Sequence, residues 1–409
     1  RDTYESFVRM NTPSDTLTTD IHLRRINPKE NDFLWYIHAK AADNKLHSLI
    51  SWDNHSKNLF KGQLIGDANF YKTEDGQSAA HVRILPSEIL VGDTVWNIKP
   101  ADISYYKEHL DISNLSVQHK KQHLIINGTA TKNKRDEIQV DLNDVDVKYI
   151  LNLINFHSVK FSGLASGKAS ISSVFSDPQA EADLTVKDFR FQDGRMGTLE
   201  ANVNYWNEEG QININAYTHD EGTKNTFIKG YVSPKHNSID LNIDAEGTRL
   251  EFIEDFCGSF MKNVEATVAG DIRVYGPLNN INLSGKVVAN GPVTISSLNT
   301  TYEMINDTVL IVPDHIVFQR DTVYDRNNNI GILSGSVDHE HLTNFKYYLN
   351  VEAKNLLAYD THEFGDNTFY GTAYATGSCT IDGRKDGEVL INVEATPEKG
   401  SQIVYNAAS

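Results

Sequence analysis

Residues 373–381 read AYATGSCTI, and three similar stretches precede them: GQLIGDANF at 62–70, GLASGKASI at 163–171 and ATVAGDIRV at 266–274. The fifth residue of each stretch is a glycine, and successive glycines are 101, 103 and 107 residues apart. A long and nearly constant spacing is typical of a repeat array. The repeat glycines are Gly66, Gly167, Gly270 and Gly377.

Counted from its first residue, every second residue of each stretch is apolar or glycine. In the third stretch, Asp271 and Arg273 stand between Gly270, Ile272 and Val274. This alternation predicts a β-strand with one apolar face and one polar face. The same pattern recurs in many other segments, and Asp-Gly and Asn-Gly pairs separate these segments, which indicates short antiparallel connections.

The sequence therefore predicts an all-β fold: an elongated, repeat-built antiparallel sheet curled into a half-pipe with a hydrophobic concave groove. A sheet that closes until its own side chains fill it, giving a dry solenoid, is the alternative for the same pattern. No linker composition interrupts the chain, so residues 1–409 are expected to form one continuous domain. Its repeat units are expected at 1–61, 62–162, 163–265, 266–372 and 373–409.

A few short amphipathic helices are expected before the glycine strands. Apolar residues recur at helical spacing over 147–154 and 253–261, with Thr248 as a candidate N-cap of the second segment. Weaker versions of the pattern cover 355–363 and 44–51.

Composition excludes several classes of function. The net charge of −17 disfavours a nucleic-acid partner. Cys257 and Cys379 are too few for a disulfide framework, and no apolar run is long enough to cross a bilayer. We find no spacing of residues that predicts a metal site, a cofactor site or catalytic residues, and we expect every carboxylate in a turn or on the polar parity of a strand. We therefore expect a protein that is not an enzyme.

The apolar residues that alternate along the predicted strands share one face, and we take them as the groove-lining residues. If the concave face stays open, these side chains form a strip large enough to hold acyl chains. They are Ile212, Ile214, Ile239, Leu241, Ile243, Ile272, Val274, Ile281, Leu283, Val287, Leu349, Val351, Val389, Ile391 and Val393.

The segment FYGTAYATGSCTIDGRKDGEVLINVEATPEKGSQIVY, residues 369–405, resembles the C-terminal conserved region of the TamB (translocation and assembly module) family in its Bacteroidota form. Segments 92–100, 124–146 and 166–191 are similar to the same family. The resemblance implies a β-taco fold related to AsmA-like and bridge-like lipid-transfer proteins. It also implies a periplasmic location, as part of a protein anchored in the inner membrane by a segment outside these residues.

Two functions follow from this resemblance and from the groove. The first is a periplasm-spanning groove that conducts phospholipid between the inner and outer membranes and supports outer-membrane biogenesis. The second is a scaffold for outer-membrane β-barrel protein assembly or secretion, acting by strand augmentation. The expected partners are phospholipid acyl chains in the groove and, at the C-terminal end, an Omp85-family outer-membrane barrel of the TamA or BamA type.

Overall fold

The computed structural model describes residues 16–24, 33–42, 45–54, 61–72, 76–91, 94–149, 160–206, 209–221, 223–257, 261–341, 343–364, 368–383 and 389–405. Contacts between Cα atoms divide the chain into two compact units. Unit 1 comprises residues 1–157, 164–186 and 202–209, and unit 2 comprises residues 158–163, 187–201 and 210–409.

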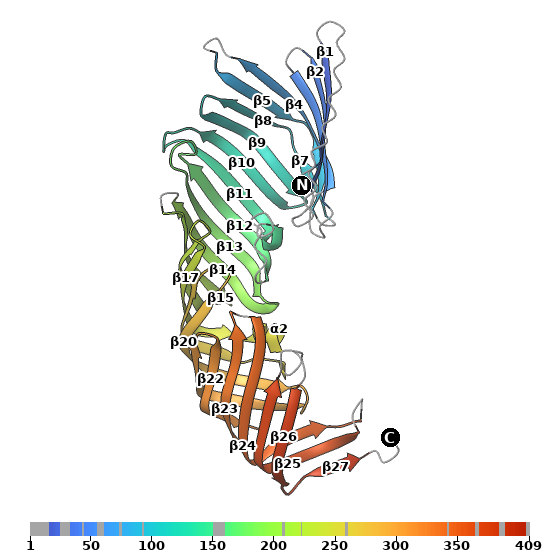
Figure 1. Ribbon diagram of the computed structural model, residues 1–409, viewed down its shortest axis with the longest axis vertical. Coiled ribbons are helices and arrows are strands. Elements are labelled where there is room, and N and C mark those ends of the chain that lie inside the picture. The colour runs from blue at the N-terminus through green and yellow to red at the C-terminus, as the bar shows by residue number, and fades with distance from the viewer. Residues whose placement is uncertain are drawn as a thin grey trace. The chain divides into compact units, whose positions relative to one another are not determined.

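Strands make up nearly all of the regular structure (Figure 1). The first eleven are β1 (Thr16–Arg24), β2 (Phe33–Ala42), β3 (Lys45–Asn54), β4 (Lys61–Lys72), β5 (Ser78–Ile84), β6 (Ser87–Val91), β7 (Thr94–Ile98), β8 (Ala101–Tyr106), β9 (His109–His119), β10 (Gln122–Ala130) and β11 (Glu137–Asp146).

The remaining elements are β12 (Phe161–Ser172), β13 (Gln179–Phe191), β14 (Gly194–Trp206), β15 (Gln211–Asp220), β16 (Thr223–Ser233), β17 (Ser238–Arg249), the 3-10 turn η1 (Glu251–Ile253), α2 (Glu254–Cys257), β18 (Met261–Lys262), β19 (Thr267–Gly276), β20 (Asn282–Ile295), β21 (Thr300–Val312), β22 (His315–Tyr324), β23 (Ile330–Glu340), β24 (Thr343–Thr361), β25 (Phe369–Gly383), β26 (Val389–Pro397) and β27 (Gln402–Tyr405).

The strands belong to one antiparallel sheet, and no pairing among the described strands joins its two ends. The four glycine stretches lie in the strands β4, β12, β19 and β25, with Ala266 of the third stretch directly before β19. The predicted all-β, antiparallel fold is therefore confirmed. In unit 1, β4 pairs with both β5 and β6 along different parts of its length. A small hydrophobic core of unit 1 lies where β5 to β8 meet. It consists of Ile84, Ile89, Trp96, Ile98 and Ala101.

Unit 2 keeps one side of its sheet in register across ten strands. Directly paired residues of antiparallel strands project to the same face, so successive pairs trace a row of side chains along that face. The central row from β16 to β26, leaving out β18, contains nine apolar or glycine residues and one threonine. It runs through Thr226, Ala245, Gly270, Val287, Val309, Phe318, Gly335, Leu349, Ile381 and Ile391. We call this side of unit 2 the apolar face and the other side the polar face.

The sheet of unit 2 curls around its apolar face. Met261 in β18 packs against Leu349 and Ile381 in β24 and β25, and so does Ile295 at the end of β20. Strands β21, β22 and β23 separate β20 from β24 in the ladder. Contact over so many strands requires a curl, in agreement with the predicted half-pipe.

The repeat glycines lie where neighbouring strands approach closely. At Gly270 the φ angle is +138°, and a Cβ atom built there would lie 2.3 Å from the carbonyl oxygen of Lys286 in β20. An L side chain is strained at such a φ angle and would collide with this backbone. Gly66, Gly167 and Gly377 have a neighbouring carbonyl oxygen in the same place, at 2.9, 2.0 and 2.2 Å.

Several expected helices are strands in the structure. In the segment 355–363, residues 355–361 continue β24, where Leu356 and Leu357 pair with β25 and are 3 % and 2 % exposed. Residues 45–51 belong to β3. Of the helix expected at 147–154, residues 147–149 are helical and the rest lie outside the described residues.

The helix expected at 253–261 forms as η1 followed by α2, and Met261 begins β18, while residues 258–260 lie outside the described residues. The expected N-cap is wrong. Leu250 occupies the cap position of η1. Thr248 is buried in β17, where its hydroxyl lies 2.6 Å from that of Thr226.

We expect Gly270→Ala to lower the free energy of unfolding by about 2–4 kcal/mol, since it adds both φ strain and a clash with Lys286. Urea unfolding followed by circular dichroism measures the change. Gly247→Ala is the matched control, because Gly247 has φ +107° but no atom within 4 Å of an added Cβ. Equal effects of the two substitutions would contradict a role for close strand approach.

Candidate functional site

The predicted groove residues of unit 2 occupy the apolar face in adjacent rows. One row runs Ile228, Ile243, Ile272, Gly285 and Ile311. The next runs Ile214, Gly230, Leu241, Val274 and Leu283, and a third joins Ile212, Val232 and Ile239. Toward the C-terminus, Val351 pairs with Cys379 and Cys379 with Val393, while Val389 pairs with Gly383. The structure thus brings these residues together on one face, and Ile281 directly precedes β20.

Most of these side chains are only half-buried. Val287 and Leu349 are 4 % and 6 % exposed, and both belong to packed clusters of the apolar face. In contrast, Ile243, Ile272, Val274 and the other predicted residues of β15, β17 and β19 have intermediate exposure, and Val393 is 60 % exposed. Apolar side chains in a finished core are usually fully buried. The apolar face is therefore filled in part by the chain itself and open in part.

The polar face carries paired charges. Both guanidinium Nε and Nη2 of Arg273 donate to the carboxylate of Asp240, at 2.9 and 2.6 Å, and the guanidinium lies 4.9 Å from the centre of the Tyr275 ring. The hydrogen bond from Arg273 lowers the pKa of Asp240 below its ordinary value. This face is well suited to contact with water.

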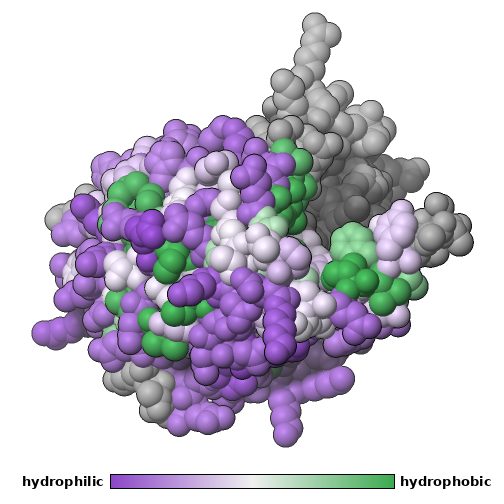
Figure 2. Space-filling model, turned by 90° about the horizontal axis from the view of Figure 1, so that it is seen from below, coloured by the Kyte–Doolittle hydropathy of each residue, from purple (hydrophilic) through white to green (hydrophobic). Residues whose placement is uncertain are grey.

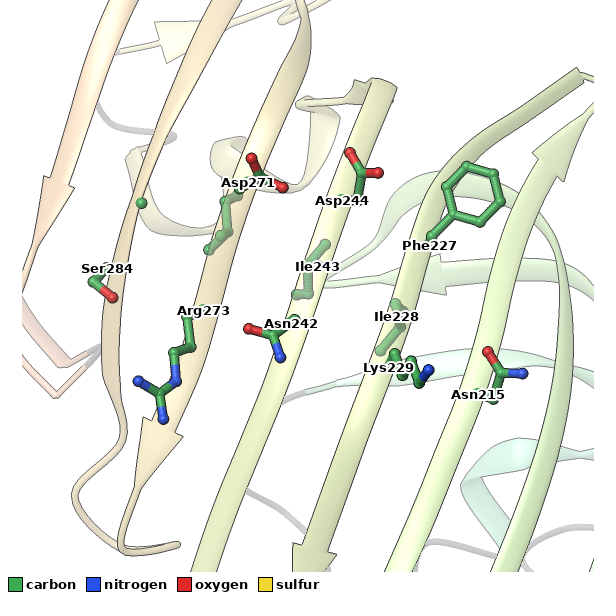
Figure 3. A pocket seen from close by; sticks show the side chains of 12 residues that line it. Asn215, Phe227, Ile228, Lys229, Asn242, Ile243, Asp244, Asp271, Arg273 and Ser284 are labelled. Carbon is green, nitrogen blue, oxygen red and sulfur yellow. The ribbon is translucent and has the colours of Figure 1, made fainter.

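An open hollow of about 620 Å³ lies along β15, β16, β17, β19 and β20 (Figure 3). Two polar rows line it, one of Phe227, Asp244 and Asp271 and the other of Asn215, Lys229, Asn242, Arg273 and Ser284, together with the apolar row between them, Ile228, Ile243, Ile272 and Gly285. Asp244 and Asp271 are direct cross-strand partners and both are exposed. We assign no ligand to this hollow.

Two carboxylates on the apolar face were not anticipated from the sequence, where every carboxylate was expected in a turn or on the polar parity. That expectation is wrong for Asp307 and Asp321. Asp307 pairs with Ala289, and Asp321 pairs with Leu333. They are 6 % and 7 % exposed. Asp307 stands two residues before Val309, and Asp321 stands two residues before Val323. The alternation of faces along a strand therefore places both carboxylates on the apolar face, and the sequence contained this information.

Irregular strand pairing accommodates this acidic pair. The ladder shifts between Ala289 and Gly291 and again between Phe318 and Asp321. The backbone N–H of Thr322 donates to Oδ1 of Asp307 at 2.9 Å, whereas Oδ2 of each carboxylate is buried without a hydrogen-bond partner. Burial raises the pKa of both groups, and the negative charge of Asp307 adds to the rise at Asp321, whose pKa is about 6.

Four histidines lie close together in pairs along the sequence, His119 with His123 and His339 with His341. The ring of His119 contacts the carbonyl of Val95 at 2.7 Å, and that of His123 contacts Asp141 at 3.3 Å. His339 is buried, with Nδ1 3.6 Å from Asp314, and His341 lies 3.8 Å from the same carboxylate. In the part of the chain that the structure describes, no group of three or more His, Cys, Asp or Glu side chains is arranged to hold a metal ion.

The last strands present exposed apolar side chains. β25 pairs with β26 from Ala375 to Gly383 and with β27 from Phe369 to Thr372. Leu390, Val393, Ile403 and Tyr405 on β26 and β27 are 47–65 % exposed. Figure 2 shows green apolar patches among the purple polar surface on the side of the molecule that it presents. Of the helices in the described residues, none has the length and apolarity that a membrane crossing requires.

We expect Asp321→Asn to stabilise unit 2 at pH 8 by roughly 1 kcal/mol or more and to have little effect at pH 4. A raised pKa means that ionised Asp321 disfavours the folded state. The penalty is absent below the ordinary pKa of 3.8, grows as pH rises toward about 6, and is complete above it. Thermal unfolding at both pH values measures the difference.

Asp240→Asn is the control of opposite sign, because the lowered pKa of Asp240 makes its ionised form stabilising. It should destabilise at pH 8 and lose this effect as pH falls below 3.8. A gain from Asp321→Asn that is equal at pH 4 and pH 8 would contradict the assignment.

Comparison with protein families finds the TamB C-terminal domain at residues 319–409. These residues run from within β22 to the end of the chain and contain the 369–405 segment whose resemblance is described above. Comparisons with curated proteins and with solved structures find no match.

The family match is consistent with a TamB-type role in outer-membrane protein assembly or lipid transport, which is not an enzymatic role. It also suggests a periplasmic location and a partner protein in the outer membrane. The recognition of this family from the sequence is thereby confirmed for residues 319–409, which match the TamB C-terminal domain.

Proposed function

We propose that the apolar face of the chain conducts phospholipid between the inner and outer membranes of the cell envelope, as part of a periplasm-spanning, inner-membrane-anchored protein that supports outer-membrane biogenesis. The observation that carries the proposal is the set of half-buried apolar rows in unit 2, which share one face over consecutive strands. Acyl chains are the occupant, since they gain free energy by leaving water for such a face without requiring polar partners.

A phospholipid is amphipathic, and its acyl chains and its headgroup occupy different surroundings in this arrangement. Acyl chains lie against residues such as Leu241, Ile243 and Val274, while headgroups stay in water at the open side of the curl. The polar face, with pairs such as Asp240 and Arg273, stays hydrated. The mechanism is passive movement along an apolar surface, with no cofactor and no bond chemistry.

The second candidate is a scaffold for outer-membrane β-barrel proteins that works with an Omp85-family barrel of the TamA or BamA type. The observation that favours it is the end of the sheet. Among the described strands, β26 pairs only with β25, so its other edge offers backbone groups for strand augmentation. Exposed Leu390 and Val393 on β26 add apolar surface there.

A photo-crosslinking residue at Ile243 should form covalent phospholipid adducts after irradiation of living cells, whereas the same residue at Asp244 should form few. The two positions are neighbours on β17 and lie on opposite faces, so each is the control for the other. Mass spectrometry of the purified protein identifies the adducts. Crosslinks from Ile243 only to the protein's own chain would favour a closed core and leave the scaffold as the better function.

Polar substitution separates the two candidates. Leu241→Glu places a carboxylate on the apolar face, where burial against acyl chains costs several kcal/mol. We expect it to abolish phospholipid adducts at Ile243 and to sensitise cells to outer-membrane stress. Asn242→Glu, on the exposed polar parity of the same strand, is the matched control and should leave both readouts unchanged. If Leu241→Glu removes the adducts but outer-membrane integrity is normal, the conduit is not the function that cells require.

A further inference from the structure

A short segment crosses the apolar face of unit 2. We call η1 and α2, residues Glu251–Cys257, the strap. Leu250, immediately before it, packs against the buried cluster that contains Ala245, Val268 and Val287. Met261, which follows it in β18, packs against Leu349 and Ile381. The strap therefore lies on the side of the sheet that carries the apolar rows.

One side of the strap is tied to β14 and its neighbours by polar and close backbone contacts. The backbone N–H of Arg195 donates to Oε2 of Glu251 at 3.1 Å, and Nζ of Lys160 lies 3.2 Å from Oδ2 of Asp255. The Phe252 ring is 5.1 Å from that of Phe191. A Cβ atom at Gly194 would lie 2.3 Å from the backbone nitrogen of Phe252, so this glycine lets the strap lie directly on β14.

The network around Glu251 strengthens this attachment. Arg249 donates to Oε1 of Glu251 at 3.4 Å and to Asp220 at 2.9 Å, and Arg195 donates to the same Asp220 carboxylate at 2.6 Å. These groups come from β14, β15, β17 and η1. Linked charges of this kind hold a geometry better than an isolated surface pair.

The other side of the strap meets β24 through an aromatic contact. The rings of Phe256 and Phe345 have their centres 5.0 Å apart, and Phe345 in turn lies 5.6 Å from the ring of buried His339. Strands β17 and β19 to β24 pair in succession. The strap, which is seven residues long, contacts both β14 and β24 and thus bridges the apolar face. Nearby, Met261 of β18 also packs against this face.

We propose that the strap is a gate in the lipid path, which opens by separating Phe256 from Phe345 while its attachment to β14 stays in place. This inference rests on the function proposed above and adds to it a point of control. The two attachments differ in chemistry. Acyl chains can replace a contact between two phenyl rings, because both are apolar, but they cannot replace the carboxylate contacts of Glu251 and Asp255. Lipid entering the curl therefore releases the β24 side first.

The test locks the gate. Phe256→Cys and Phe345→Cys are combined in a chain that also carries Cys257→Ala and Cys379→Ala, and a short methanethiosulfonate cross-linker joins the two new thiols in living cells. A photo-crosslinking residue at Ile214 on β15 or Ile391 on β26 reports phospholipid at two places on the apolar face of unit 2. We expect locking to lower the adducts at one or both positions about tenfold, and reductant to restore them.

The unlocked four-substitution protein is the control for folding, because lock and release act on the same molecules. If phospholipid adducts are equal at both positions with and without the lock, the strap is a fixed brace and the gate is wrong. If the unlocked protein gives no phospholipid adducts at either position, the proposed lipid path itself has failed. Phe345→Ala supplies an independent arm, since it weakens the closed state without any cross-link and should not lower the adducts at either position.

Discussion

Strand register is the constraint on which unit 2 depends. Side chains alternate between faces with a period of two, so a slip of one residue would turn the apolar row of a strand toward water. The central row keeps its face from Thr226 on β16 to Ile391 on β26. Along most of this path the neighbours are valine, isoleucine, leucine or glycine. Glycines such as Gly270 and Gly335 let strands approach closely, and their positive φ angles fit the sharp curvature of the sheet.

The shifts in register lie where the apolar face changes character. Those around Gly291 and Asp321 flank the acidic pair, and another in β24 directly precedes Leu356. A bulge leaves backbone groups outside the ladder, and nearby side chains satisfy them. Asp307 accepts from Thr322, and Asp325 accepts from the backbone N–H of Leu357 at 2.8 Å. Buried carboxylates on the apolar face are thus tied to the bends of the strands that hold them.

Strand type and face could be predicted from sequence because both depend on local alternation. The four glycine stretches and most predicted groove residues, such as Leu241 and Val274, lie where that alternation indicated. Helices at 355–363 and 44–51 could not be excluded locally, since pairing with β25 and with β2 and β4 decides their structure. The strap was predicted as a helix, but its contacts with Gly194 and Phe345 join residues far apart in sequence, which periodicity does not report.

The character of the apolar face favours movement over tight binding. Hydrophobic contact is non-directional, so rows of similar aliphatic side chains offer an acyl chain nearly the same free energy at each step. Along the rows that contain Leu241 and Ile243, movement across the strands β15 to β19 therefore meets only aliphatic side chains and glycine. Two features of unit 2 interrupt this uniform apolar face. The strap occupies space inside the curl, and Asp307 and Asp321 place carboxylates on the apolar face. At the strap, the balance between ring contacts and acyl contacts at Phe345 then sets how often the proposed gate opens.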